Sequence, residues 1–166
     1  MPAGRVVVVG VFPGQPDAVV LEAARFASAF GAELLCAHAD SARYAFIGGY
    51  DGAIMSMPID PDLTDAEPPP FPPELAVHLD EVLAPMQVPF TTQELAGDPS
   101  LALARVAAQV HAIMIVVGTR RATVRGAIDQ FLNGSVAAHL AHRQRRPVVV
   151  VPLNPSPPEE RLPWES

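Results

Sequence analysis

Apolar residues form short continuous runs along this chain, and the runs alternate with stretches in which apolar residues recur at helical spacing. Runs of this length that are rich in valine and isoleucine are typical of strands buried on both faces of a parallel sheet. Such runs occur at residues 5–11, 33–39, 112–117 and 147–151, and residues 90–95 alternate loosely between apolar and polar, as a strand does. The hydrophobic pattern therefore predicts five strands.

The first predicted helix begins near Pro16 and Asp17 and ends at Gly31, because glycine suits a left-handed helix terminus. Its apolar face is expected to comprise Val19, Ala23, Phe26, Ala27 and Phe30. A second helix is predicted over residues 74–84 and is ended by Pro85. Its apolar stripe is expected to consist of Leu75, Leu79, Val82 and Met86.

A third helix is predicted after the turn Gly97-Asp98-Pro99, which supplies a capping carboxylate and a proline for the first helical position. Its inward face is expected to consist of Leu103, Val106, Ala107 and Val110. A fourth helix is predicted from about Ser135 to His142. Three arginines suit the negative end of its dipole, namely Arg143, Arg145 and Arg146. Because strands and helices alternate at the spacing of right-handed βαβ units, we expect an α/β fold on a parallel sheet.

The chain has 166 residues, enough for one domain with a sizeable core, which we place at residues 1–153. Residues 40–73 interrupt the pattern with glycines, six acidic residues and seven prolines, and they are predicted to form a long loop insertion. Its final prolines, residues 68–73, are interpreted as a stiff spacer rather than an SH3-type ligand. Residues 154–166 are predicted to be a proline-rich C-terminal tail.

Charge and composition exclude several functional classes. The net charge is −7 and all eleven basic residues are arginine, so binding to nucleic acid or to an anionic membrane surface is not expected. Without lysine, the chain has no Walker-type phosphate loop and no Schiff-base chemistry. No segment resembles a signal peptide or a membrane span, so we expect a cytoplasmic protein. The lone Cys36 lies in an apolar run and is predicted to be buried and inert.

The histidines offer little support for metal binding or catalysis. His139 and His142 lie three positions apart on a predicted helix, but no third ligand has supporting spacing. We therefore expect no metal site and no catalytic residue. The other histidines are expected to be structural, with His38 at a strand end or in the core, and with His78 and His111 on or near helices without partners.

The segment that joins the fourth predicted strand to the fourth helix is the strongest candidate for a binding site. The strand ends at Gly118 and Thr119, and Gly134 and Ser135 open the helix, whose free backbone amides attract anions. Between them lie three arginines with bidentate donors suited to phosphate, namely Arg120, Arg121 and Arg125. Alternatively, these arginines pair with Asp129 and other acidic residues on the surface.

Several of these segments, taken in order, resemble the universal stress protein family. The motifs are Gly97-Asp98-Pro99, Val116-Val117-Gly118-Thr119-Arg120, Gly134-Ser135-Val136 and Pro147-Val148-Val149-Val150-Val151-Pro152. The segment Ala32-Glu33-Leu34-Leu35-Cys36-Ala37-His38 also looks like that family's second strand. The resemblance covers residues 5–152.

The resemblance implies an open five-stranded parallel sheet with the order 3-2-1-4-5 and helices on both faces. This is the Rossmann-like, adenine-nucleotide alpha-hydrolase-like fold. A ligand crevice is expected at the carboxyl ends of the strands, where the strand order reverses. The resemblance further implies a homodimer formed through the last strand, residues 147–152.

Some members of that family bind ATP through Gly-x2-Gly-x9-Gly-Ser/Thr after the fourth strand, together with an acidic residue at the end of the first strand. Gly118 and the pair Gly134-Ser135 match this fingerprint. Arg121 replaces the second glycine, the last interval is three residues too long, and Gly126 is a partial substitute. Phe12 occupies the place of the acid. The fingerprint is therefore degenerate.

The resemblance still marks a set of positions for contact with a nucleotide. They are Val11, Phe12, Ala39, Gly118, Thr119, Arg120, Arg121, Arg125, Gly126, Gly134, Ser135 and Val136. Glycine allows phosphate to approach the backbone, whereas Arg121 fills that space and adopts a positive φ only with strain. The arginines favour phosphate in return, and Phe12 is suited to stacking on a base.

These observations favour a non-enzymatic stress-response module that binds ATP or another phosphorylated ligand. An alternative is a nucleotide-free dimeric interaction module whose 40–73 insertion or C-terminal tail contacts a protein partner. A third hypothesis is slow hydrolysis of ATP.

Overall fold

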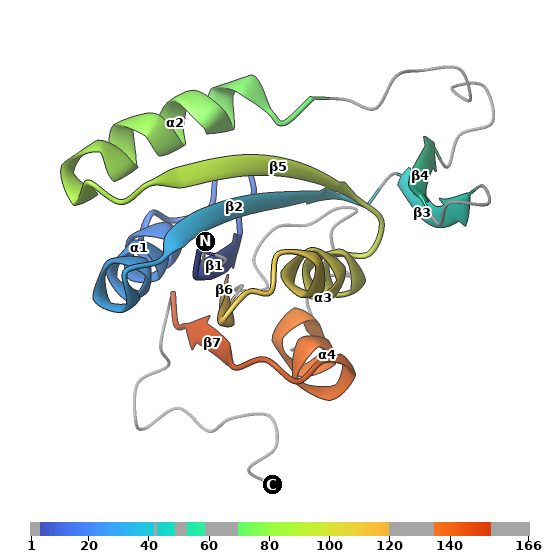
Figure 1. Ribbon diagram of the computed structural model, residues 1–166. Helices are drawn as coiled ribbons and strands as arrows, with labels where there is room; N and C mark the ends of the chain where they lie inside the picture. Colours follow the sequence, from blue (N-terminus) through green and yellow to red (C-terminus); the bar gives the residue numbers. More distant parts are fainter. Residues whose placement is uncertain (1–3, 42, 49–52, 59–69, 120–134, 154–166) are drawn as a thin grey trace, which may run out of the picture.

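The structure is a computed structural model that describes residues 4–41, 43–48, 53–58, 70–119 and 135–153 (Figure 1). Its elements in chain order are β1 (Val6–Gly10), α1 (Ala18–Phe30), β2 (Glu33–Asp40), β3 (Arg43–Gly48), β4 (Ala53–Pro58), α2 (Pro73–Leu83), the 3-10 turn η2 (Ala84–Met86), β5 (Phe90–Ala96), α3 (Pro99–Gln109), β6 (Met114–Gly118), α4 (Ser135–Arg143) and β7 (Val148–Val151). The predicted tail, residues 154–166, lies outside the described residues.

Five of the strands form one sheet with the order β5-β2-β1-β6-β7. Every neighbouring pair in it is parallel. Counted among the five predicted strands, this is the order 3-2-1-4-5, so the predicted fold class and topology are confirmed. The chain moves outward from β1 to β5, then crosses to β6 on the other side of β1. The order therefore reverses between β1 and β6.

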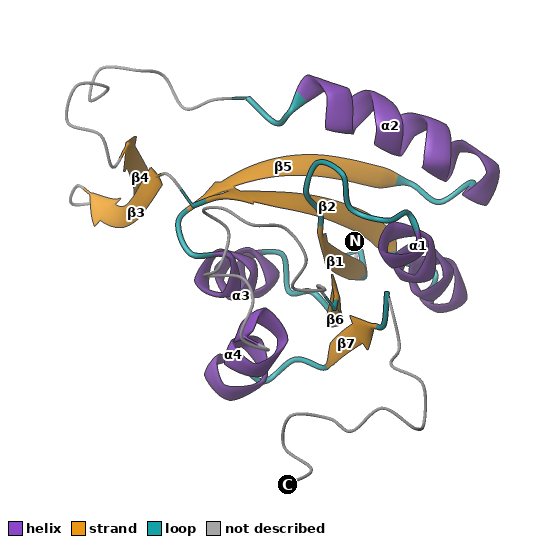
Figure 2. Cartoon of the chain, turned by 180° about the vertical axis from the view of Figure 1, so that it is seen from behind, coloured by secondary structure: helices purple, strands orange, loops and turns teal. Residues whose placement is uncertain are grey.

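The sheet separates two hydrophobic clusters, one under each pair of helices (Figures 1 and 2). Side chains alternate along β1, so Val7 and Val9 face α1 and α2 while Val8 faces α3 and α4. All three valines are fully buried, which explains why the sequence of β1 is a continuous apolar run.

Helix α1 ends at Gly31, which adopts a left-handed conformation with φ of 57° as predicted. The prediction for Phe30 is wrong, because its side chain is 42% exposed. The buried face of α1 is centred further round the helix than predicted, since Val20 and Ala24 are also buried. Phe26 is half-buried at the margin of this face, and Phe30 lies at the end of the helix.

Helix α2 buries a stripe at helical spacing that consists of Leu75, Leu79 and Leu83. Of the predicted stripe, Leu75 and Leu79 are confirmed, whereas Val82 and Met86 are only partly buried against the same cluster. In α3, Leu103, Val106 and Ala107 are buried as predicted. The predicted inward residue Val110 is partly buried beyond the helix end.

The prediction of one long loop over residues 40–73 is wrong. Asp40 is the last residue of β2, and β3 and β4 form an antiparallel hairpin that pairs Arg43 with Pro58 and Gly48 with Ala53. Two short runs of apolar and aromatic residues flank glycines here, which is a hairpin signal. The density of proline and acidic residues in the insertion concealed that signal.

Candidate functional site

The carboxyl ends of β1, β2 and β6 lie side by side at one edge of the sheet. The backbone N–H of Val11 donates to the carbonyl oxygen of Ala37 at 2.9 Å, so β1 and β2 stay paired to their ends. Val9 is in register with Val116, and two residues further along are Val11 and Gly118. The fold thus brings Val11, Ala39 and Gly118 from three separate predicted motifs to the same edge. In open α/β sheets this edge, at the point where the strand order reverses, is the usual place for a ligand.

Several predicted site residues lie outside the described part of the chain, namely Arg120, Arg121, Arg125, Gly126 and Gly134. Asp129, the alternative partner of the arginines, lies outside it as well. Ser135 is the first residue of α4, as predicted. Val136, in the first turn of α4, is partly buried against the cluster under α3 and α4. Because α4 follows β6 and leads back to β7, its N-terminus lies at the carboxyl edge of the sheet.

Packing requires a glycine at position 118, independently of any ligand. A Cβ added to Gly118 would lie 2.7 Å from Cγ2 of Val19 and 3.2 Å from Cδ1 of Leu153. Val19 is a fully buried residue in the first turn of α1. The absence of a side chain at Gly118 therefore lets the start of α1 approach the end of β6.

Thr119, the residue after this glycine, makes two hydrogen bonds to the end of β7 and the residues after it. Its backbone N–H donates to the carbonyl oxygen of Val151 at 2.9 Å, and its Oγ1 accepts a hydrogen bond from the N–H of Leu153 at 2.9 Å. These bonds join the end of β6 to the end of β7. The hydroxyl of Thr119 still has a proton to donate, so it remains a candidate ligand contact.

The loop after β1 turns sharply at a glycine. Gly14 has φ of 78°, and the N–H of Gln15 donates to the carbonyl oxygen of Phe12 at 3.1 Å. Nε2 of Gln15 donates to the carbonyl oxygen of Gly10 at 3.2 Å, which ties the loop to the strand. Phe12 is half-buried, and together with Val11 it lines a cavity of about 320 Å³ on the side of the sheet that carries α1 and α2.

His38 is paired with Glu94 across β2 and β5. The two residues are in register, and Nδ1 of His38 lies 2.8 and 2.9 Å from the carboxylate oxygens of Glu94. Phe71 meets the imidazole edge to face, with ring centroids 6.2 Å apart. Burial raises the pKa of Glu94, and the nearby Asp40 adds to this effect while His38 opposes it. The sequence predicts His38 at a strand end or in the core; it lies two residues before the end of β2 and is partly buried. Its pairing with Glu94 was not predicted.

His78 was predicted to have no partner, and this prediction is wrong. Nε2 of His78, on α2, lies 2.7 Å from Oδ1 of Asp17, at the start of α1. The two residues are 61 positions apart, so only the packing of α1 beside α2 brings them together. Both side chains are about half exposed and line the cavity described above.

The lone cysteine is part of the hydrophobic core. Cys36 is fully buried, and burial raises the pKa of its thiol to about 12, which confirms an inert cysteine. Over the part of the chain that the structure describes, no group of three or more histidine, cysteine, aspartate or glutamate side chains is arranged to hold a metal ion. None of the described helices is long and apolar enough to cross a bilayer.

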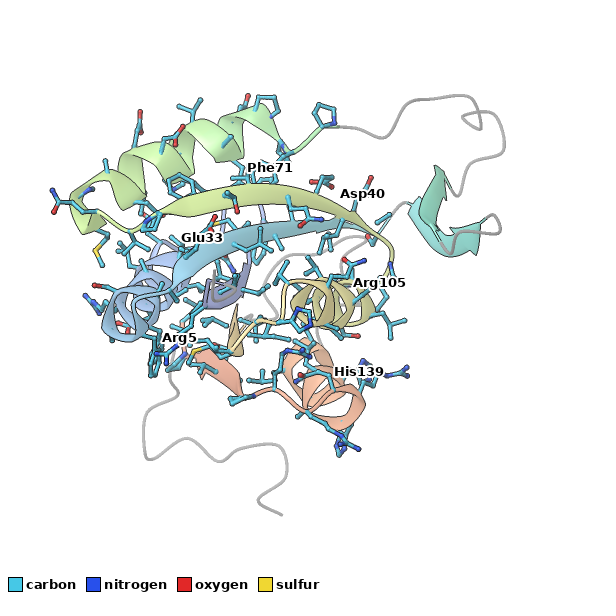
Figure 3. The ribbon with its side chains drawn as sticks, in the orientation of Figure 1. Arg5, Glu33, Asp40, Phe71, Arg105 and His139 are labelled. Atoms are coloured by element: carbon cyan, nitrogen blue, oxygen red, sulfur yellow. The ribbon has the colours of Figure 1, made fainter. Side chains whose placement is uncertain are left out.

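Figure 3 shows how charged and aromatic side chains are distributed over the two faces of the sheet. Glu33 and Asp40 lie at opposite ends of β2, and Asp40 is at the carboxyl edge. Phe71 lies on the α2 side, whereas Arg105 and His139 lie on the α3 and α4 side. The carboxyl edge of the sheet thus carries an acidic residue at the end of β2.

Comparison with known proteins identifies the family to which this fold belongs. The profile described as "Universal stress protein family" matches residues 4–152. A search of the curated proteins finds no match. Among solved structures, a universal stress protein from Archaeoglobus fulgidus is 22% identical with a TM-score of 0.57, and the match covers 89% of this chain and 98% of that one.

Two similar structures contain a bound nucleotide. A universal stress protein from Archaeoglobus fulgidus in complex with dAMP is 21% identical, with a TM-score of 0.56, and the match covers 90% of this chain and 98% of that one. A family protein from Arabidopsis thaliana with AMP bound is 14% identical, with a TM-score of 0.50 and coverage of 95% and 99%. These structures share the parallel sheet described above, and the family profile spans it. This chain therefore belongs to the universal stress protein family.

Proposed function

We propose that this protein is a stress-response module of the cytoplasm that binds an adenine nucleotide between the loop after β1 and the segment after β6. The observation that carries the proposal is the convergence of Val11, Gly118 and the N-terminus of α4 at the switch point of the sheet. Solved structures of family members contain cAMP, dAMP or AMP, which supports an adenine nucleotide as the ligand class.

The contacts proposed for the phosphate of the nucleotide are clearer than those for its base. The first backbone N–H groups of a helix such as α4 have no acceptor within the helix, and a helix N-terminus favours negative charge. Arg120, Arg121 and Arg125 precede this helix in the sequence and supply bidentate donors. The proposed role of these arginines is to hold a phosphate against the start of α4.

Recognition of the base relies on stacking rather than on a charged hydrogen bond. Phe12 stands where other family members have an acid, and a hydrogen bond to a charged group contributes about 1.5–3 kcal/mol. We therefore expect weaker binding than in a site that retains the acid, by roughly tenfold or more. Stacking on Phe12 offsets part of this loss.

The proposal is tested by calorimetric titration of the purified protein with AMP and with ATP, together with native mass spectrometry for nucleotide that copurifies. Arg121→Ala is expected to weaken binding about tenfold, because it removes a charged donor from the phosphate. Arg143→Ala, an exposed residue at the far end of α4, is the matched control and is expected to bind as the wild type does.

Absence of binding by every variant at millimolar nucleotide, with none copurified, would overturn the proposal. It would favour the alternative of a nucleotide-free dimeric interaction module. The proposed function is binding without turnover. Phosphate release from ATP above background, lost in Arg121→Ala, would instead support slow hydrolysis.

A further inference from the structure

The cavity between α1 and α2 lies apart from the segment that follows β6. Its volume of about 320 Å³ is at the lower end of the range typical of small-molecule sites. The loop after β1 and the first turn of α1 form one wall, and α2 forms the other (Figure 2). Val11 and Phe12 are its contacts with the carboxyl edge, whereas Ala39 and Gly118 do not line it.

The floor of the cavity consists of buried aliphatic side chains. Val11, Val20, Leu75 and Leu79 line it, and each is at most 7% exposed. These side chains belong to the main hydrophobic cluster of the α1 and α2 side, so the cavity is a recess in the core surface. An apolar group placed there would lose its contact with water at no cost in backbone rearrangement.

The mouth of the cavity is polar and has an acidic character. Asp17 and His78 line it and are joined by the 2.7 Å contact between Nε2 and Oδ1. Among the described residues that line the cavity, Asp17 carries the formal negative charge and none is arginine. A phosphate or carboxylate ligand would therefore meet a carboxylate without a balancing guanidinium, whereas an ammonium group would find an acceptor.

We propose that this cavity is a second binding site, for a small amine with an apolar aryl or branched alkyl body. The body occupies the recess over Val20, Leu75 and Leu79, and the ammonium group donates to Asp17 at the mouth. The site shares Val11 and Phe12 with the proposed nucleotide site, but it lies between α1 and α2, where Asp17 favours a cation over a phosphate. The inference rests on the cavity, its floor and the Asp17–His78 pair, and does not depend on nucleotide binding.

The test uses three molecules of nearly equal shape that differ in charge: 2-phenylethylamine, 2-phenylethanol and phenylacetate. Each is titrated into the full-length protein while backbone amide signals are followed by two-dimensional NMR. We expect the amine to shift signals of Val11, Val20 and Leu79 saturably, with a dissociation constant on the order of 1 mM. The alcohol is expected to bind more weakly and phenylacetate not to bind.

Two variants separate the roles of charge and shape. Asp17→Asn is expected to weaken amine binding about tenfold and to leave binding of the alcohol unchanged, since asparagine keeps the polar mouth without the charge. Leu75→Phe is expected to abolish binding of both probes by filling the recess. Asp80→Asn, an exposed carboxylate on the same helix, is the control and is expected to bind as the wild type does.

Thermal unfolding of each variant verifies that it is folded. The proposal is overturned if no probe shifts the lining residues saturably, or if phenylacetate binds as tightly as the amine. It is also overturned if Asp17→Asn and Asp80→Asn weaken the amine equally, because the effect would then be general electrostatics rather than recognition at the mouth.

Discussion

At the scale of single residues, Gly118 shows that packing can require a glycine that a binding motif also contains. In the sequence it matches the first glycine of a nucleotide fingerprint. In the structure its missing side chain leaves the space into which Val19 and Leu153 pack. Both roles are compatible, since one face of the residue meets α1 while its backbone lies at the carboxyl edge.

Gly118→Ala is expected to destabilise the protein by about 1–3 kcal/mol, because the new Cβ would overlap buried Val19. Urea unfolding measures the change in free energy. Gly4→Ala is the matched control, since nothing lies within 4 Å of a Cβ at that position, and it is expected to change stability by less than about 0.5 kcal/mol. Equal stability of the two variants would show that α1 does not press on β6 as described.

His38 and Glu94 illustrate a second limit at the same scale. Each lies in a predicted strand, but their contact depends on which strands are neighbours and on the register between them. A sequence pattern gives the facing of a side chain within its strand and not its partner on the next one. The pairing of His78 with Asp17 was missed for the same reason, because it spans two helices.

At the scale of elements, local signals located helix starts and ends well. Asp98 caps α3 by accepting a hydrogen bond from the N–H of Leu101 at 3.0 Å, and Oγ of Ser100 donates to the same oxygen. Burial raises the pKa of the Asp98 carboxyl, but the bonds from Ser100 and Leu101 and the nearby His139 bring it below its usual value overall. The charged cap therefore stabilises the folded state.

Asp98→Asn is expected to lower stability at neutral pH by about 0.5–1 kcal/mol, since asparagine caps without the charge. A lowered pKa in the folded state means that the charge contributes fully above the usual value of 3.8, and that this contribution is lost as the pH falls through the folded pKa. The difference between wild type and Asp98→Asn should therefore shrink in acid. Urea unfolding at several pH values tests this, with Asp80→Asn as the control. A difference that stays constant below the usual pKa would contradict the charged cap.

The hairpin of β3 and β4 shows where element prediction failed. The inner strands β1 and β6 appear in the sequence as continuous apolar runs, because both of their faces are buried. The hairpin is short, belongs to a separate two-stranded sheet and lies among prolines and glycines, so its signal is weak. Predictions from hydrophobic pattern work best where burial on both sides constrains composition.

At the scale of the whole molecule, β7 is an edge strand of the parallel sheet. Val150 on this strand is 42% exposed, whereas the next residue, Val151, is buried. Edge strands with exposed apolar residues are prone to pair with another chain. This supports the proposal of a homodimer through residues 147–152.

Val150→Glu is expected to convert the proposed dimer to a monomer, because a charge on the edge of β7 would have to be buried in the interface. Size-exclusion chromatography with light scattering measures the mass. Val77→Glu, at a 59% exposed valine on α2, is the control and should leave the mass unchanged. A wild type that is monomeric, or a Val150→Glu variant that remains dimeric, would contradict this interface.

The sequence by itself determined the five parallel strands, the four helix starts to within a residue or two, and the buried Cys36, because burial and capping leave local marks in residue type and spacing. The resemblance to a family supplied the strand order. Only the tertiary structure decided which side chains meet, since Asp17 with His78, His38 with Glu94 and Val19 over Gly118 join residues far apart in the chain. The cavity between α1 and α2 belongs to the same class, because its shape depends on how two helices pack and on nothing that either encodes alone.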